Sequence, residues 1–174
     1  HVTNDLPKRT NQILVGVDFG YKNPAAIVEI HEDYDGVYWI VSEYYKREKL
    51  NADIIEYTKS IGAHRVYPDP AEPDRIEEMR RASIPVCEVN KDVAKGIDSV
   101  RALFKARKLK IHSSCVNLIW EIENYRYKDG RAGFNDSEEP IKENDHLMDA
   151  MRYVLFMQNG NVSTRHMLQN RMQV

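Results

Sequence analysis

The sequence predicts an α/β domain in which a mixed sheet carries helices on both faces, and two observations indicate this class. The chain opens with three apolar strand patterns separated by turns, and it then alternates strand and helix patterns. Consecutive strands joined by turns pair antiparallel, whereas strands separated by helices pair parallel, so the two patterns together predict a mixed sheet. The 174 residues suffice for one such domain with a hydrophobic core.

The first part of the chain carries the antiparallel strands. Strands are expected at about 13–19, 25–31 and 37–45. The segment 51–63 places apolar side chains at helical spacing and ends at Gly62, a residue that suits a helix C-terminus. Residues 64–70, "HRVYPDP", predict a short strand stopped by prolines. Residues 1–12 are polar and are expected to form a linker or a frayed end.

The second part alternates helices and strands. Helices are expected over 71–83, 91–108, 116–125 and 145–158, a buried strand over 84–89, and a strand or turn over 109–114. Residues 125–134 alternate Tyr with basic residues up to an Asp-Gly pair, which predicts a hairpin, and an acidic loop follows over 135–144. The tail from residue 159 is polar. We therefore expect one domain over residues 13–158 between two polar ends, 1–12 and 159–174.

Charge and cysteine content narrow the class of protein. The net charge of −2 gives no global indication of nucleic-acid binding, but residues 91–110 hold seven Lys or Arg against two Asp. This segment is either a phosphate-binding face or an ordinary solvated helix face. No apolar run approaches the roughly 18 residues of a membrane span. Cys87 and Cys115 match no metal or redox spacing, so both are expected to be buried thiols of an intracellular protein.

Three acidic residues are expected at one edge of the sheet. Asp18 ends the first strand, and Asp69 follows the strand after the first helix. Asp149 lies in the closing helix, where it is expected to share a polar arc with Asp145, His146 and Tyr153. Carboxylates brought together repel one another, and a divalent ion removes the repulsion; hard oxygen ligands suit Mg²⁺ or Mn²⁺. The alternatives are that Asp18 caps a turn, and that Asp69 and Asp145 cap helices.

Four segments resemble successive blocks of the nuclease domain of large terminase subunits, the DNA-packaging motors of tailed bacteriophages. They are "VGVDFGYKNPAA", "VYPDPAEPDRIEEMR", "VNKDVAKGIDSVRALF" and "NDHLMDAMRY", in order over about residues 13–158. The last of them is the most specific. The resemblance implies a ribonuclease H-like fold and a metal-dependent endonuclease that cuts concatemeric double-stranded viral DNA during genome packaging, largely without sequence preference.

The resemblance also implies roles for individual residues. Asp18, Asp69 and Asp149 would bind two Mg²⁺ or Mn²⁺ ions, with Asp145 as a further candidate, and His146 would be an auxiliary ligand or orient substrate or water. Two-metal hydrolysis would leave 5′-phosphate and 3′-hydroxyl ends. The basic residues expected to contact DNA are Lys91, Lys95, Arg101, Lys105, Arg126 and Lys128. Two acids before the hairpin, Glu121 and Glu123, are expected to pair with surface bases.

The implied partners are double-stranded DNA, the terminase ATPase domain, the small terminase subunit and the portal protein, in the cytoplasm of an infected bacterium and away from any membrane. No glycine here opens a G-x-x-x-x-G-K-[ST] loop, so we expect the nuclease half of the motor only.

Three other functions compete with this interpretation. "GVDFGYKN" also resembles the first phosphate loop of actin-like and sugar-kinase ATPases, but those folds need a second Gly-rich loop and a much longer chain. A Holliday junction resolvase-like nuclease would keep the same fold, and a docking module would keep the acids only as relics. ATP binding, preference for four-way junctions, and loss of nicking in Asp18→Ala distinguish these functions.

Overall fold

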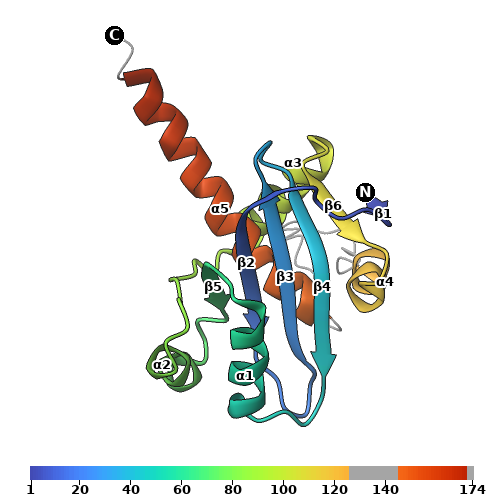
Figure 1. Cartoon of the computed structure of the whole chain (residues 1–174), viewed down its shortest axis with the longest axis vertical. Helices are drawn as coiled ribbons and strands as arrows, with labels where there is room; N and C mark the ends of the chain where they lie inside the picture. The colour runs from blue at the N-terminus through green and yellow to red at the C-terminus, as the bar shows by residue number, and fades with distance from the viewer. Residues whose placement is uncertain (126–144, 172–174) are drawn as a thin grey trace, which may run out of the picture.

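The structure, a computed structural model, describes residues 1–125 and 145–171, with side chains as far as residue 159. Six strands form one sheet in the order β1-β6-β4-β3-β2-β5 (Figure 1). The strands are β1 (Val2–Thr3), β2 (Thr10–Asp18), β3 (Ala25–Asp33), β4 (Tyr38–Lys46), β5 (Arg65–Pro68) and β6 (Leu109–His112). Strands β2, β3 and β4 pair antiparallel, while β5 and β6 pair parallel with β2 and β4. The predicted mixed sheet is therefore confirmed.

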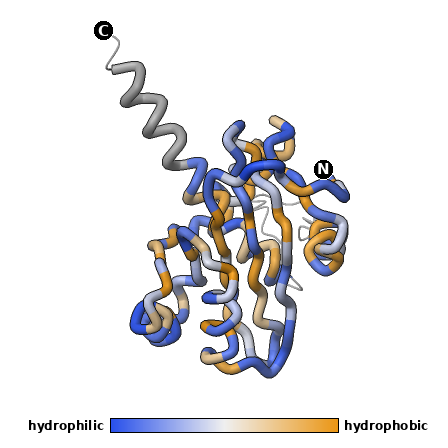
Figure 2. Tube along the Cα trace, viewed as in Figure 1, coloured by the Kyte–Doolittle hydropathy of each residue, from blue (hydrophilic) through white to orange (hydrophobic). Residues whose placement is uncertain are grey.

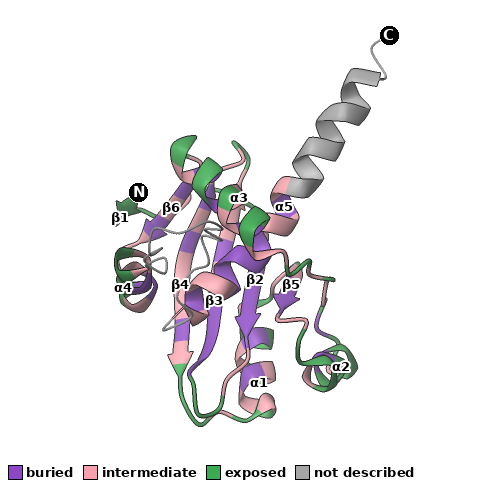
Figure 3. Cartoon of the chain, turned by 180° about the vertical axis from the view of Figure 1, so that it is seen from behind, coloured by how far each residue is buried: buried purple, intermediate pink, exposed green. Residues whose placement is uncertain are grey.

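Helices cover both faces of this sheet. They are α1 (Asn51–Ile61), α2 (Pro73–Arg81), α3 (Val93–Lys105), α4 (Val116–Asn124) and α5 (His146–Arg171). Along β2 the side chains alternate, so that Leu14 joins the core under α3, α4 and α5, while Val15 and Val17 join the core under α1 and α2. Figure 3 shows the middle of the sheet as the most buried part, and Figure 2 shows its apolar character. The two cores hold the sheet rigid beneath the candidate site.

Helix α5 approaches the sheet most closely at Gly16 of β2. A Cβ atom built on Gly16 would lie 2.0 Å from the carbonyl oxygen of Ala150, so only glycine permits this approach. The contact lies two residues before the end of β2 and one residue after Asp149 in α5. Gly16 therefore determines how near the first turns of α5 come to Asp18.

One predicted strand is wrong. Residues 84–89 form no strand; Val86 makes a single parallel bridge to β5. Pro85 has no N–H to donate to a ladder, which explains why the pairing does not extend. Cys115 is buried as expected, but Cys87, in the same irregular segment, is only half-buried.

Both ends of the chain contain more regular structure than their polar sequences indicate. Residues 1–12, expected as a linker or frayed end, contribute β1, which pairs with β6, and the start of β2. Helix α5 continues past residue 158 to Arg171. No proline interrupts this segment, and a polar pattern alone does not end a helix. None of the helices in the described ranges is both long and apolar enough to cross a membrane.

Candidate active site

Two of the predicted acids lie at the carboxyl ends of adjacent parallel strands. Asp18 is the last residue of β2, and Asp69 directly follows β5, whose Pro68 lies opposite Val17. The backbone N–H of Asp69 donates to the carbonyl oxygen of Val17 at 2.8 Å, which continues this register by one residue. Parallel pairing therefore brings Asp18 and Asp69 to the same edge of the sheet.

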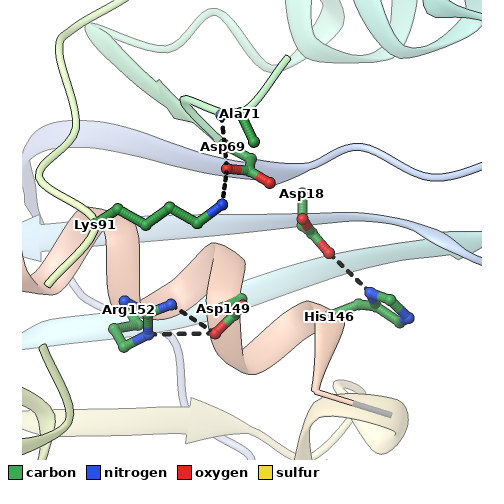
Figure 4. Close-up of polar contacts among 7 residues, drawn as sticks. All are labelled: Asp18, Asp69, Ala71, Lys91, His146, Asp149 and Arg152. Carbon is green, nitrogen blue, oxygen red and sulfur yellow. Dashed lines mark hydrogen bonds and ion pairs between the residues drawn. The ribbon is translucent and has the colours of Figure 1, made fainter. Parts of the chain in front are cut away.

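The third acid reaches this edge from α5. Asp149 lies in the first turn of α5, which begins at His146, and Nδ1 of His146 is 2.8 Å from Oδ2 of Asp18. Because side chains alternate along a strand, Asp18 points to the same face as Gly16, where α5 packs. Figure 4 shows Asp18, Asp69 and Asp149 gathered around one region, each from a different element.

Electrostatics indicates that the three acids are close enough to act on one another. Asp18 is 8% exposed, and its burial raises the pKa of its carboxyl; the hydrogen bond and charge of His146 lower that pKa, and the charges of Asp149 and Asp69 raise it. The pKa of the buried Tyr153 hydroxyl is raised by desolvation and then by the same three carboxylates. Three negative charges therefore act together at this edge.

Each of the three acids is held by its own basic side chain, as Figure 4 shows. The pairs are His146 with Asp18 at 2.8 Å, Lys91 with Asp69 at 2.9 Å, and Arg152 with Asp149 at 2.7 Å. In every pair one carboxylate oxygen takes the contact: Oδ2 of Asp18 and Oδ1 of the other two. Within the described residues, the second oxygen of each carboxylate makes no hydrogen bond. Each acid thus has one oxygen held by a basic side chain and one oxygen available.

Arg152 is a residue that the sequence analysis missed. Its side chain is buried, and its stem packs so closely on α3 that a Cβ atom at Gly96 would lie 2.8 Å from it. A buried guanidinium needs a counter-charge, which Asp149 supplies through contacts from both Nε and Nη2. The spacing of Asp149 and Arg152, three residues apart on a helix, was the available sequence signal.

Glu121 is a second missed residue, and its expected surface position is wrong. It is 2% exposed on α4, and its Oε2 accepts the Met148 N–H at 2.9 Å. Burial raises the pKa of Glu121 to about 7, although the Met148 N–H, the Tyr45 hydroxyl and His146 lower it. Glu121 therefore holds the first turn of α5 in place from a neighbouring helix. Its role depends on packing between distant segments, which a local pattern does not reveal.

The buried Glu121 carboxyl predicts a pH dependence of stability. Its pKa is about 7 in the folded protein, above the ordinary 4.5, so between these pH values the folded state binds more protons than the unfolded state. The contribution of Glu121 to stability therefore falls as the pH rises through this range. We expect the unfolding free energy of the wild type, minus that of Glu121→Gln, to fall by roughly 3 kcal/mol at most between pH 4.5 and 8. Urea titrations at several pH values measure this difference.

The matched control is Glu123→Gln, because Glu123 is exposed on the same helix. Its stability difference from the wild type should not change over the same pH range. If the stability of Glu121→Gln changes with pH in parallel with that of the wild type, the assignment of a buried Glu121 with a raised pKa is wrong.

Three of the basic residues predicted to bind DNA pair with acids in the described part of the chain. Lys91 contacts Asp69 at the candidate site. Lys95 and Arg101 pair with acids three residues away, Asp92 at 3.1 Å and Asp98 at 3.9 Å. The fourth residue of this group, Lys105, is exposed on the last turn of α3.

The remaining predicted residues lie at or beyond the start of α5. Asp145 immediately precedes α5, and its carbonyl oxygen accepts the Asp149 N–H at 2.8 Å, so its backbone begins the helix. Arg126, Lys128 and the rest of segment 126–144, which contains most of the predicted hairpin and the acidic loop, lie outside the described residues. In the described part of the chain no three His, Cys, Asp or Glu side chains converge tightly enough to hold an ion in this conformation.

Comparison with known proteins identifies the family. The family described as "Terminase RNAseH like domain" matches residues 18–156, which include all three acids at the sheet edge. The chain belongs to this family. The terminase resemblance and the ribonuclease H-like fold expected from the sequence are both confirmed.

Individual relatives agree with this terminase assignment. The large terminase subunit of Escherichia phage T5 is 30% identical over 156 residues, which are 83% of this chain and 35% of that protein. The large terminase of a thermophilic bacteriophage, in complex with ATP-gamma-S, superposes with a TM-score of 0.81 and 26% identity over 89% of this chain and 42% of that one. The large terminase nuclease domain of bacteriophage SPP1, with bound Mn, has a TM-score of 0.71 and 23% identity over 91% and 96% of the two chains. This terminase domain thus spans about a third of the T5 protein.

Proposed function

We propose that this terminase domain is a metal-dependent endonuclease that cleaves concatemeric double-stranded viral DNA during genome packaging. The observation that carries the proposal is the meeting of Asp18, Asp69 and Asp149 at one sheet edge, where their charges act on one another. Membership of the terminase family supports a role in packaging. The SPP1 relative, a nuclease domain with bound Mn, supports DNA cleavage and the use of a divalent ion.

The donor set fits hard divalent ions. Each of the three acids offers a carboxylate oxygen that takes no hydrogen bond in the described residues, and carboxylate oxygens are the ligands preferred by Mg²⁺ and Mn²⁺. The charges of Asp69 and Asp149 raise the pKa of Asp18, a repulsion that a bound cation would relieve. Asp18, Asp69 and Asp149 are therefore the proposed ligands, with Asp145 as a further candidate.

The surrounding residues orient these ligands. Two bound ions would supply a hydroxide nucleophile at neutral pH and stabilise the leaving 3′ oxygen. Lys91 and Arg152 hold one oxygen of Asp69 and of Asp149, which fixes the direction of the other oxygen. His146 holds Asp18 through Nδ1, which leaves its Nε2 for water, substrate or an ion. Cleavage by this route leaves 5′-phosphate and 3′-hydroxyl ends.

The proposed partners follow from the longer relatives. Because the domain spans 42% of the large terminase whose structure contains ATP-gamma-S, we propose that an ATPase domain supplies translocation. The small terminase subunit and the portal protein are the proposed partners of the assembled motor, which would act in the cytoplasm of an infected bacterium.

Cleavage of supercoiled plasmid tests the proposed function. We expect the purified domain to nick and then linearise plasmid in Mn²⁺ or Mg²⁺, and to leave it intact in EDTA, because the acids need ions to activate water. The linear products should be ligatable without prior phosphorylation, as 5′-phosphate ends are.

Other outcomes would point elsewhere. A folded domain that leaves DNA intact in both metals contradicts the nuclease assignment, and 3′-phosphate ends contradict the two-metal route. Marked preference for four-way junctions over linear duplex would favour a resolvase-like activity of the same fold.

A further inference from the structure

Two loops leave the sheet at the same edge as the three acids. Residues 19–24 follow β2, and residues 46–50 comprise the last residue of β4 and the turn into α1; we call these two segments the acid-edge loops. Both lie at the lower end of the sheet in Figure 1. The register places Ala26 beside Asp18, and Tyr45 beside Ala26. Since neighbouring strands are about 4.8 Å apart, the second loop begins roughly 10 Å from the Asp18 backbone.

The acid-edge loops are joined into one surface. The N–H of Glu48 donates to the carbonyl oxygen of Tyr21 at 2.8 Å, and Glu48 adopts a left-handed conformation with φ 56°. Tyr21 is 49% exposed, and Figure 3 shows the loops at this end as solvent-exposed. A long ligand at the acids would therefore meet both loops.

Basic side chains dominate this surface. The charged residues of the acid-edge loops are Lys22, Lys46, Arg47, Glu48 and Lys49. Within the described residues, none of the four basic side chains pairs with a carboxylate. In contrast, three basic residues of segment 91–105 each pair with an Asp. The four cations of the acid-edge loops are thus available for an anionic partner.

Arg47 links the acid-edge loops to the candidate site. Burial raises the pKa of the Tyr45 hydroxyl to about 12; the charge and hydrogen bond of Glu121 raise it further, and the charge of Arg47 lowers it. Arg47 therefore lies close enough to Tyr45 for their charges to interact, and Tyr45 in turn contacts Glu121, which supports the start of α5.

We propose that the acid-edge loops bind the phosphate backbone of double-stranded DNA beside the scissile bond; this inference rests on the proposed nuclease function. Duplex DNA carries one negative charge per ~1.7 Å of helix axis, so about six phosphates lie within the 10 Å that separate Asp18 from the second loop. A duplex that runs from the acids towards the second loop would place other phosphates over these cations. Phosphate contacts carry no sequence information, which agrees with the lack of sequence preference that the terminase resemblance implies.

The test compares two triple variants. Lys22→Gln/Arg47→Gln/Lys49→Gln removes charge from the acid-edge loops, and Lys8→Gln/Arg9→Gln/Arg107→Gln removes the same charge next to the starts of β2 and β6, at the opposite end of the sheet. Binding of a linear duplex is measured by fluorescence anisotropy in EDTA, which prevents metal-dependent cleavage, between 50 and 200 mM salt. Thermal melting of each variant checks that it folds like the wild type.

We expect the slope of log affinity against log salt to lose about 2 to 3 in the loop variant, because each phosphate contact contributes about 0.9, and to stay unchanged in the control variant. An unchanged slope in the loop variant, or an equal loss in both variants, overturns the inference. Plasmid cleavage in Mn²⁺ separates the two proposals. If the wild type cleaves but the loop variant keeps the wild-type salt slope, only this inference is wrong. If the wild type neither binds nor cleaves DNA, both proposals are wrong.

Discussion

Asp18→Asn is expected to abolish metal-dependent plasmid cleavage, with a loss on the order of 10³-fold or more, while the domain stays folded. Bound metal contributes several kcal/mol to such reactions, and about 4 kcal/mol corresponds to this loss. Asparagine keeps the shape of the side chain and an oxygen for His146 but removes the charge that the ions require. Because burial raises the pKa of Asp18, its charge is costly to the metal-free protein. We therefore expect Asp18→Asn to match or exceed the wild type in stability in EDTA.

Two measurements check the Asp18 prediction. The first is the plasmid cleavage rate in Mn²⁺, with Asp74→Asn as the control, since Asp74 is an exposed acid in the first turn of α2. The second is thermal melting with and without Mn²⁺, in which the ion should stabilise the wild type and the Asp74→Asn variant far more than Asp18→Asn. If Asp18→Asn cleaves plasmid at the wild-type rate, Asp18 is not one of the metal ligands.

Gly16→Ala is expected to lower the unfolding free energy by about 3 kcal/mol or more and to reduce cleavage strongly. The new methyl group would lie 2.0 Å from the Ala150 carbonyl oxygen and 2.7 Å from its carbon, so α5 must move away from β2. Overpacking of this kind costs about 1–3 kcal/mol and more where backbone has to shift. Asp149 immediately precedes Ala150, so the shift would also separate it from Asp18.

Urea unfolding of Gly16→Ala and of Gly36→Ala measures this effect. Gly36 lies in the turn before β4 with φ 68°, and a Cβ there meets no atom within 4 Å, so its variant carries backbone strain alone. The expected cost at Gly36 is about 1 kcal/mol. If the two variants lose the same unfolding free energy, the close contact between α5 and β2 does not require glycine at position 16.

Local patterns predicted most of the fold because they coincide with the tertiary contacts. The antiparallel strands β2, β3 and β4 follow from short apolar runs and turns, and the arrangement of Asp18 and Asp69 follows from parallel pairing of β2 and β5. The closing helix was recognisable from its polar and apolar arcs. In each case the residues that decide the structure are near one another in the sequence, or are brought together by a general rule of sheet topology.

What the sequence did not reveal depends on partners far along the chain. The sequence did not predict that Lys91, a residue expected to contact DNA, would also pair with Asp69, 22 residues earlier. Glu121 was expected at the surface, yet the start of α5 is built around it. Neither contact produces a periodic pattern. The strand predicted over 84–89 failed for a local reason, because the apolar run concealed the effect of Pro85 on pairing.

The one-to-one pairing of acids with basic side chains has a consequence for how the domain is handled and controlled. A protein whose clustered acids each pair with a basic side chain is expected to fold without a bound ion. Under the proposed function, we therefore expect the domain to stay folded but inactive in chelator and to become active when metal is added, without a refolding step. Under the proposed function, the ion supply would decide when DNA is cut, and a bound ion would add stability to a domain that is already folded.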